Sequence, residues 1–270
     1  MLSVRYALPD TPLILNPLVS LADTIVADRR QFAATSLPAR ALRALDRRAF
    51  AAADVVVADT YAHAELFGDL GARRVEVCAV GAEERIFHPP WKADNPPHAL
   101  FVGKLIPLHG VDVILDAARA IPDRRVVVVG DGQLARALTG RPQNVEWRRW
   151  VPYELLGGEY RRAGCALGIF ASSPKASRVI PNKAYQALAC ATPLVTADTP
   201  ASRELLEHGK SALLVPPGDA GALAAAIDVL LADQGQRARL SSGGHAAFRA
   251  NAADEILAVR WREIVAGAVC

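Results

Sequence analysis

The chain has 270 residues, 51% hydrophobic and 22% charged, a composition that favours a folded core over disorder. Its formal net charge of +3 is too small to indicate a nucleic-acid-binding protein, so we expect no nucleic acid among its partners. The sequence shows no signal peptide, no membrane-length apolar run and no Cys or His pattern for metal, so we expect a cytoplasmic protein without metal or cofactor.

The first third of the chain predicts a short α/β unit that ends at a proline-rich linker over 88–97. A helix cap is expected at Asp59-Thr60, directly after a continuous apolar run. The predicted strands cover 11–15, 54–58 and 74–80, and the predicted helices cover 38–53 and 61–67.

The predicted helix over 38–53 carries basic residues largely on one side. Arg40, Arg43 and Arg47 follow one another at spacings of three and four residues. This side is either an ordinary solvated face or a surface for anionic lipid headgroups, which would place the protein at the inner face of a cell membrane.

From residue 99 onward, strands and helices alternate regularly, and such alternation predicts a parallel sheet with helices on both faces. Ligands of such sheets bind at the carboxyl ends of the strands. Cys165 and Cys190 fall in apolar surroundings and are expected in the core, whereas His88, His98 and His208 are expected at the surface or as caps. The predicted strands are 99–102, 125–129, 145–147, 165–170, 193–196 and 212–215; the predicted helices are 110–121, 133–138, 153–163, 181–190, 201–208, 220–231, 236–247 and 254–265.

The loop after the strand at 99–102 combines two glycines with one cation and one titratable ring. Gly103-Lys104 opens it, and His109-Gly110 leads into the next helix. Backbone N–H groups and a helix N-terminus suit a phosphate, and Lys104 adds positive charge. The alternative is an ordinary loop with a surface lysine.

The second loop, Gly130-Asp131-Gly132, begins a G-x-G-x-x-A pattern between a strand and a predicted helix. This is the strongest signal for a nicotinamide-dependent dehydrogenase. The pattern follows the second strand of its unit rather than the first, and the strand at 145–147 lacks the expected ribose-binding acid. A tight turn that lines a nucleotide pocket is therefore the preferred interpretation.

The third segment, 172–183, is polar and basic. Pro181 suits the first position of a helix, which puts Lys183 in a first turn where the helix dipole disfavours a cation. A bound diphosphate would remove this conflict, and Lys175 and Arg178 add two further cations. The alternative is a solvated Lys183.

Taken in order, these motifs resemble a known family. Together with Val151-Pro152, the run 187–195 and the run 203–219, they are similar to the C-terminal domain of retaining GT-B glycosyltransferases of family 4. The resemblance implies an α/β GT-B fold of two Rossmann-like domains with parallel sheets. Residues 1–96 would form a partial N-terminal domain and linker, 97–250 the nucleotide-sugar-binding domain, and 251–270 a helix that packs back towards the N-terminal domain.

The resemblance also implies an activity: transfer of a sugar from a nucleoside-diphosphate sugar to a saccharide or lipid-linked acceptor, in cell-envelope polysaccharide or glycoconjugate synthesis. Lys104 and His109, which can both be cationic, replace the family's Arg and Lys on the donor diphosphate, and Lys183 serves the phosphates. Arg178 and Gln186 occupy the positions of the family's two glutamates, which contact the donor sugar and the ribose. The remaining implied donor contacts are Gly103, Gly130, Gly132, Trp150, Val151, Pro181 and Asn182.

Two departures from the family leave an alternative open. The chain begins near the fourth strand of the family's N-terminal domain, which suggests a truncated form. Arg178 reverses the charge of the sugar-contacting glutamate. A non-catalytic nucleotide-sugar-binding or scaffold protein is therefore the rival hypothesis, ahead of the dehydrogenase.

Overall fold

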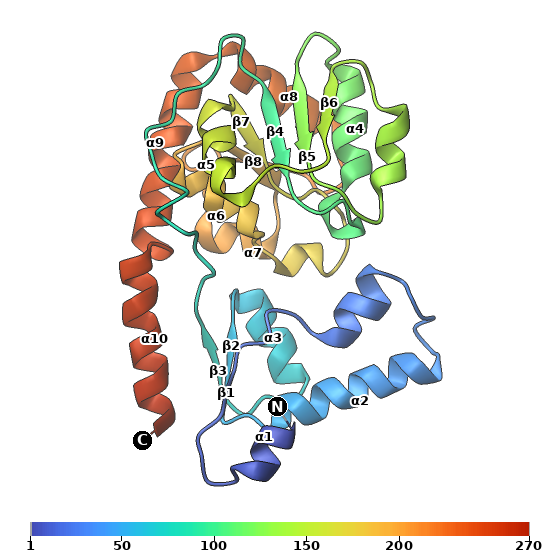
Figure 1. Ribbon diagram of the computed structural model, residues 1–270, viewed down its shortest axis with the longest axis vertical. Coiled ribbons are helices and arrows are strands. Elements are labelled where there is room, and N and C mark those ends of the chain that lie inside the picture. The colour runs from blue at the N-terminus through green and yellow to red at the C-terminus, as the bar shows by residue number, and fades with distance from the viewer. Residues whose placement is uncertain (1, 270) are drawn as a thin grey trace.

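The computed structural model describes residues 2–269, which form two parallel α/β units stacked end to end (Figure 1). The first unit lies below the second in this view, and a linker runs upward between them. The last helix, α10 (Asp254–Val269), returns from the second unit and runs down beside the first.

The first unit contains a small sheet in the order β1-β2-β3. Its core is a cluster around Phe50 and Phe67, whose rings stack with centroids 4.8 Å apart. Thr60 caps α3 through its side chain, as predicted. The elements are β1 (Ile14–Leu15), β2 (Val55–Ala58), β3 (Val75–Val77), α1 (Leu2–Ala7), the π-helix η1 (Asp23–Asp28), α2 (Leu37–Ala51) and α3 (Tyr61–Asp69).

The second unit contains a parallel sheet in the order β6-β5-β4-β7-β8-β9. The chain moves outward from β4 in one direction and then from β7 in the other, so the strand order reverses between β4 and β7. Ligands of doubly wound sheets bind at such a reversal, outside the carboxyl ends of the strands. The strands are β4 (Ala99–Val102), β5 (Val126–Val129), β6 (Val145–Arg148), β7 (Cys165–Leu167), β8 (Leu194–Ala197) and β9 (Leu213–Val215).

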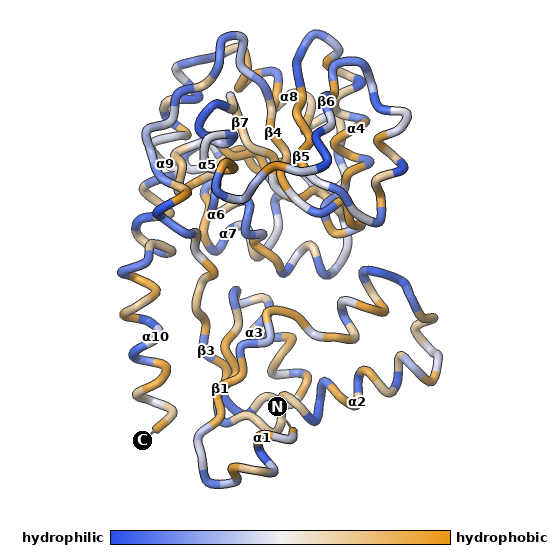
Figure 2. The backbone as a smooth tube through the Cα atoms, viewed as in Figure 1, coloured by the Kyte–Doolittle hydropathy of each residue, from blue (hydrophilic) through white to orange (hydrophobic). Residues whose placement is uncertain are grey.

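Helices cover both faces of this sheet, as the alternation predicted (Figure 1). The strands are apolar along their length (Figure 2) because both of their faces are buried. Cys165 and Cys190 are fully buried, as expected of core residues. The helices are α4 (Val111–Ala120), α5 (Tyr153–Arg162), α6 (Asn182–Ala189), α7 (Pro200–Leu205), α8 (Ala220–Ala232) and α9 (Gln234–Asn251).

The structure corrects two predictions about helices, besides shifts of up to four residues at the ends of others. The helix expected at 133–138 is instead a 3₁₀-helix, η3 (Ala135–Gly140), because the Leu134 N–H donates to the Leu105 carbonyl and holds the start of the segment against the first loop. Pro181 has an extended backbone and precedes α6 as its N-cap, so it is not the first helical residue.

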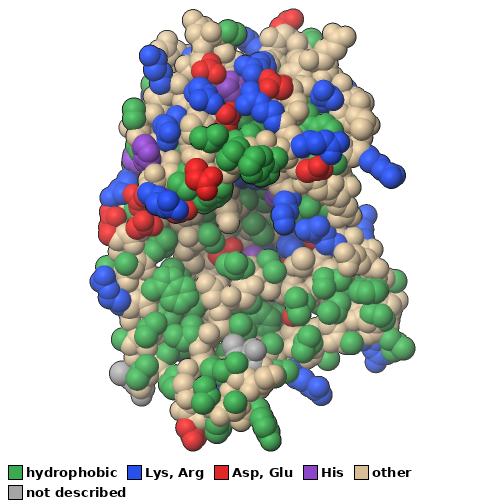
Figure 3. Space-filling view, in the orientation of Figure 1, with side chains coloured by type: hydrophobic (Ala, Val, Ile, Leu, Met, Phe, Trp, Pro, Cys, Tyr) green, Lys and Arg blue, Asp and Glu red, His purple; other side chains and the backbone are tan. Residues whose placement is uncertain are grey.

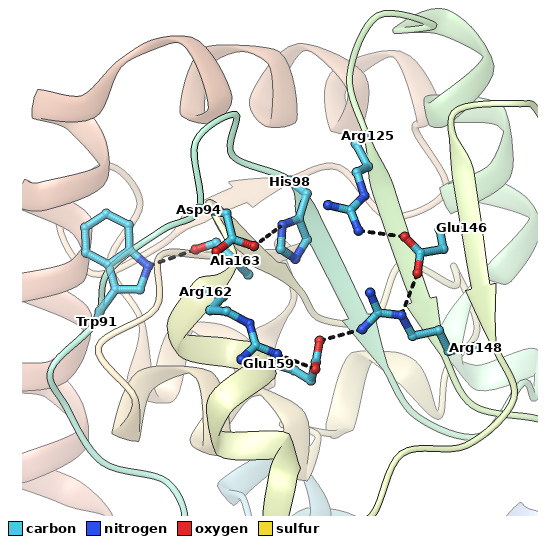
Figure 4. A network of polar contacts seen from close by, with 9 residues as sticks. All are labelled: Trp91, Asp94, His98, Arg125, Glu146, Arg148, Glu159, Arg162 and Ala163. Atoms are coloured by element: carbon cyan, nitrogen blue, oxygen red, sulfur yellow. Dashed lines mark hydrogen bonds and ion pairs between the residues drawn. The ribbon is translucent and has the colours of Figure 1, made fainter.

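A network of hydrogen bonds and ion pairs connects the linker to the second unit and joins β6 to α5 (Figure 4). The Trp91 indole donates to the Ala163 carbonyl at 2.8 Å. Arg148 joins Glu146 of its own strand to Glu159 of α5, which fixes the loop between β6 and α5. His98 was expected at the surface or as a cap, but it is buried beside Asp94, and burial lowers its pKa.

Helix α10 closes the first unit. Ile264 is buried against Val55 and Val57 of β2, with Leu257 and Trp261 packed beside them. Arg260 donates to the Val77 carbonyl and pairs with a β3 carboxylate. No helix within residues 2–269 has the length and apolarity needed to cross a membrane.

Candidate functional site

The loops singled out from the sequence lie at the reversal of strand order, where the second unit faces the first. The β4 loop runs through η2 (Pro107–His109), and the β7 loop runs through η4 (Ala176–Arg178) into α6. The molecule is hollowed between its upper and lower parts, with basic side chains on the rim (Figure 3). The site therefore lies at the predicted edge of the sheet and opens toward the first unit.

The centre of the site is a contact between Gly103, His109 and Lys183. A methyl group added at Gly103 would lie 2.7 Å from the Lys183 Nζ and 3.2 Å from the His109 ring, so only glycine leaves room for both side chains. Lys183 Nζ lies 4.0 Å from the centroid of the Phe101 ring, which supplies a cation–π contact. His109 and Lys183, two candidate site residues predicted from separate loops, thus lie side by side against Gly103.

Lys183 is buried in this position, and its Nζ has no hydrogen-bond partner among the described residues. Burial therefore lowers the pKa of Lys183 well below that of an ordinary lysine. A buried ammonium without a counter-charge is costly, and an anion bound beside it would remove that cost.

His109 differs from its predicted charge state. Burial, with the charge of Lys183 as a second cause, lowers the pKa of His109 to about 2. Its Nδ1 donates to the Lys104 carbonyl, so the neutral ring fixes the loop and leaves Nε2 as a hydrogen-bond acceptor. The expectation that His109 supplies partial positive charge was therefore wrong for the ligand-free protein.

Gly130 and Gly132 allow two loops to pack closely. A methyl group at Gly130 would lie 2.0 Å from the Gly103 carbonyl oxygen, and one at Gly132 would lie 2.8 Å from the Leu105 carbonyl oxygen. Gly132 also has a φ of +154°. Both glycines therefore support the first loop, which accounts for the G-x-G pattern without a nicotinamide cofactor.

The other predicted donor contacts differ in their exposure to solvent. Lys104 and Asn182 are exposed, whereas Pro181 is half-buried. Gln186, one turn after Asn182 on α6, accepts a hydrogen bond from the Tyr160 hydroxyl at 3.1 Å and keeps its amide N–H groups free. On the β6–α5 loop, Trp150 is 75% exposed and Val151 is half-buried.

Two of the three cations predicted in the β7 loop are paired with the first unit. Arg178 pairs with Asp23 at 2.9 Å. Lys175 donates to Thr24 and lies 3.7 Å from Asp28, both on η1. The expectation that these cations face a bound anion was wrong for Lys175 and Arg178, because carboxylates of the first unit neutralise both side chains.

The start of α3 also forms hydrogen bonds with the second unit across the cleft, which is the hollow between the two units. Thr60 donates to the Arg178 carbonyl at 2.7 Å. The backbone N–H groups of Tyr61 and Ala62 donate to the carboxylate of Glu204 on α7, a favourable charge at a helix N-terminus.

Sequence reasoning missed the polar residues that the first unit presents to the cleft. Asp59 directly follows β2, and His63 lies four residues later on α3, with its Nδ1 hydrogen-bonded to the Asp59 carboxylate. The i, i+4 spacing after a buried strand was the available signal. Within residues 2–269, no group of three or more His, Cys, Asp or Glu side chains is arranged to hold a metal ion.

Comparison with solved structures places this fold among GT-B proteins. Sucrose-phosphate synthase from Thermosynechococcus elongatus superposes over 94% of this chain and 68% of its own, with a TM-score of 0.76 and 20% identity. The Anabaena protein HepE, solved in complex with UDP-glucose, superposes over 98% of this chain and 75% of its own, with a TM-score of 0.73 and 18% identity. At this identity the likeness establishes the fold.

The sequence establishes the family. Residues 96–233 match the family described as Glycosyl transferases group 1, and the chain belongs to that family. The D-inositol 3-phosphate glycosyltransferase of Xylanimonas cellulosilytica is 29% identical over 250 residues, which cover 79% of this chain and 57% of that protein. The chain spans about half the length of the curated relatives it matches.

Proposed function

We propose that this protein transfers a sugar from a nucleoside-diphosphate sugar to a hydroxyl-bearing acceptor in polysaccharide or glycoconjugate synthesis. The observation that carries the proposal is the buried Nζ of Lys183, which has no partner within residues 2–269 and lies beside Gly103 and His109 at the reversal of strand order. That is where a doubly wound sheet binds a nucleotide, and an unpaired buried cation there calls for an anion.

In this proposal the donor diphosphate lies between the β4 loop and the N-terminus of α6. Lys183 and Lys104 supply positive charge, and the free N–H groups of the first turn of α6 supply hydrogen bonds. His109 positions the loop and offers Nε2 as an acceptor to a hydroxyl group of the donor. Because these groups carry the charge, we expect donor binding without metal, and it should survive EDTA.

The remaining predicted contacts are assigned to the two ends of the donor. Gln186 would hydrogen-bond the ribose through its free amide group. Trp150 and Val151 would form the wall against the base. Arg178, where the family carries a glutamate, lies beside the expected position of the donor sugar. We infer that the transfer retains the anomeric configuration of the donor sugar. The anomeric signal in the ¹H NMR spectrum of the initially formed product would test this.

The decisive experiment is titration calorimetry of the purified chain with UDP, GDP and ADP and their glucose or mannose conjugates. At least one nucleotide should bind, and Lys183→Met should weaken it by about a hundredfold, since a charge-assisted contact contributes about 1.5–3 kcal/mol. Lys210→Met is the matched control, because Lys210 is exposed and pairs only with Glu207. Failure to bind any of these ligands, or equal affinity in Lys183→Met, would refute the proposal.

The charge state of Lys183 allows a second measurement on the same complex. Burial lowers its pKa in the free protein, and a diphosphate would raise that pKa again. Nucleotide binding should therefore take up a proton at pH values between the pKa of Lys183 in the unliganded protein and its pKa in the complex. Calorimetry in buffers of different ionisation enthalpy measures this uptake, and Lys183→Met should abolish it.

For the acceptor, we propose a saccharide or lipid-linked compound and a peripheral contact with a membrane through α2. Arg40 and Arg47 are exposed on this helix, Arg43 is half-buried, and Leu37 is 76% exposed near its start. Basic and apolar groups side by side favour an anionic lipid surface. The chain should sediment with phosphatidylglycerol vesicles, and Arg40→Glu/Arg47→Glu should abolish this binding.

A further inference from the structure

Buried polar atoms without partners are concentrated around the cleft. The described residues contain seven such side-chain atoms, and five of them belong to residues that flank the cleft between the two units. Because an unsatisfied buried polar atom is unfavourable, this concentration indicates a polar ligand in the cleft. The five residues are Asp23, Arg29, His63, Arg178 and Lys183.

Two of these five residues, Arg29 and His63, line a cavity on the side of the first unit. A cavity of about 260 Å³ is lined by Asp59 and His63 from that unit and by Pro181 and Asn182 from the second. Pockets for drug-sized ligands begin at about 300 Å³, so this cavity suits one small molecule such as a single sugar ring. Asn182 and Pro181 directly precede Lys183, so the cavity adjoins the proposed diphosphate site.

The walls of the cavity are mixed in character. Thr24, Asp28 and Arg29 contribute polar groups, and Ile106 and Leu108 contribute an apolar surface. A polyhydroxyl compound offers both hydroxyl groups and apolar C–H faces, so it matches such a wall.

The geometry of His63 defines what it can bind. Its Nδ1 is hydrogen-bonded to the Asp59 carboxylate, and its ring lies parallel to Phe67 at 5.5 Å between centroids. The carboxylate requires a proton on Nδ1, and in this tautomer of imidazole the lone pair lies on Nε2. Nε2 is buried and has no partner among the described residues. A hydroxyl group is a donor that fits this atom.

We propose that His63, held in orientation by Asp59, accepts a hydrogen bond from a hydroxyl group of a polyhydroxyl acceptor bound in this cavity. The inference rests on the proposed function, since the donor sugar must enter the cleft from the opposite wall. His63 contacts the acceptor, and Asp59 acts as a positioning residue through His63.

Two substitutions at position 63 separate this role from a structural one. In His63→Asn the side-chain amide can still donate to Asp59 in place of Nδ1, but nothing replaces Nε2. In His63→Gln the amide reaches the Nε2 position, and its oxygen can accept a hydroxyl group. The asparagine variant therefore keeps the internal contact, and the glutamine variant keeps the contact to the acceptor.

The experiment measures nucleoside-diphosphate release from UDP-glucose, GDP-mannose and ADP-glucose by the full chain, with water alone and with methyl α-D-glucoside or glycerol. With the donor that binds, His63→Asn should lower acceptor-dependent release about tenfold, as expected for one lost hydrogen bond, with unchanged donor affinity. His63→Gln should recover part of that loss. In the unsubstituted protein, the ¹⁵N resonance of His63 Nε2 should shift when methyl α-D-glucoside is added to the donor complex.

The outcomes distinguish the two proposals. Absence of donor binding overturns the proposed function and this inference with it. Donor binding without release by the unsubstituted chain counts against the proposed transfer and overturns this inference with it. Acceptor-dependent release that is equal in His63→Asn overturns this inference alone. Equal loss in the Asn and Gln variants, or a His63 resonance that does not respond to methyl α-D-glucoside, would show that the ring is only structural.

Discussion

The two units are both parallel α/β sheets, but they bury their apolar side chains to different extents. In the second unit, large apolar clusters cover both faces of the sheet. In the first unit the main cluster contains five buried residues, and side chains such as Leu18, Phe32 and Tyr61 are exposed. The lower part of Figure 3 accordingly shows many apolar side chains at the surface. The proposed donor site therefore rests on the better-packed unit, whereas the first unit depends on α10 and on contacts across the cleft.

The largest expected effect tests whether the two units are separable. Phe67→Ala removes a fully buried ring that stacks on Phe50, and should destabilise the first unit by about 3–5 kcal/mol. Hydrogen exchange should show faster exchange in α3, and calorimetry should show nucleotide affinity unchanged. Parallel loss of affinity would show that the units are not independent.

The next effect concerns the loops of the second unit. Gly130→Ala forces a methyl group against the Gly103 carbonyl, and we expect a loss of about 3 kcal/mol together with loss of nucleotide binding. Gly140→Ala is the control, because no atom lies within 4 Å of the added methyl group. Thermal unfolding and calorimetry check both variants, and an unaffected Gly130→Ala would contradict the close packing.

A smaller effect should appear on acidification. The folded-state pKa of His109 is about 2, below the value of 6.5 expected after unfolding, so the unfolded chain binds more protons below pH 6.5. The contribution of the neutral His109 ring to the free energy of unfolding is therefore fully present above pH 6.5. At pH 5 the free energy of unfolding should be lower by about 2 kcal/mol. His109→Asn keeps a donor for the Lys104 carbonyl without titrating. Urea unfolding of both proteins from pH 7 to pH 5 should show the larger loss in the unsubstituted chain.

The smallest effect concerns the bridge between the units. Glu204→Gln weakens the charge at the N-terminus of α3, and we expect a loss of about 1 kcal/mol. Amide exchange of Tyr61 and Ala62 should accelerate. Glu207→Gln serves as the comparison, since the Glu207 carboxylate pairs only with the exposed Lys210, and it should leave exchange in α3 unchanged.

The sequence predicted the sheet of the second unit well because its strands are continuous apolar runs between turn signals. The strand at 99–102 was placed at its observed ends, and the others differ by a few residues at their ends. The segment at 133–138 was misassigned because its backbone is held by Leu105, far away in sequence. A local pattern carries no information about such a contact.

Within the candidate site, local chemistry selected residues that the fold brings together, but it did not give their charge states. Gly103, His109 and Lys183 were selected from separate loops, and they lie together because the strand order reverses between β4 and β7. That His109 is neutral follows from burial and from the nearby charge of Lys183, which spacing along the chain does not specify. The pairing of Arg178 with Asp23 joins residues 155 positions apart.

By itself, the sequence determined the alternation of strands and helices, the family and the residues of the donor loops, because apolar periodicity, turn glycines and ordered motifs are local properties. Only the tertiary structure decided which charges remain unpaired. Lys175 and Arg178 are neutralised by acids of the first unit. Among residues 2–269, Lys183 Nζ has no partner, and neither has Nε2 of His63, a residue that lines the cavity. The physical reason is that burial and pairing depend on which segments meet in space, and the site lies where two separately patterned units face each other.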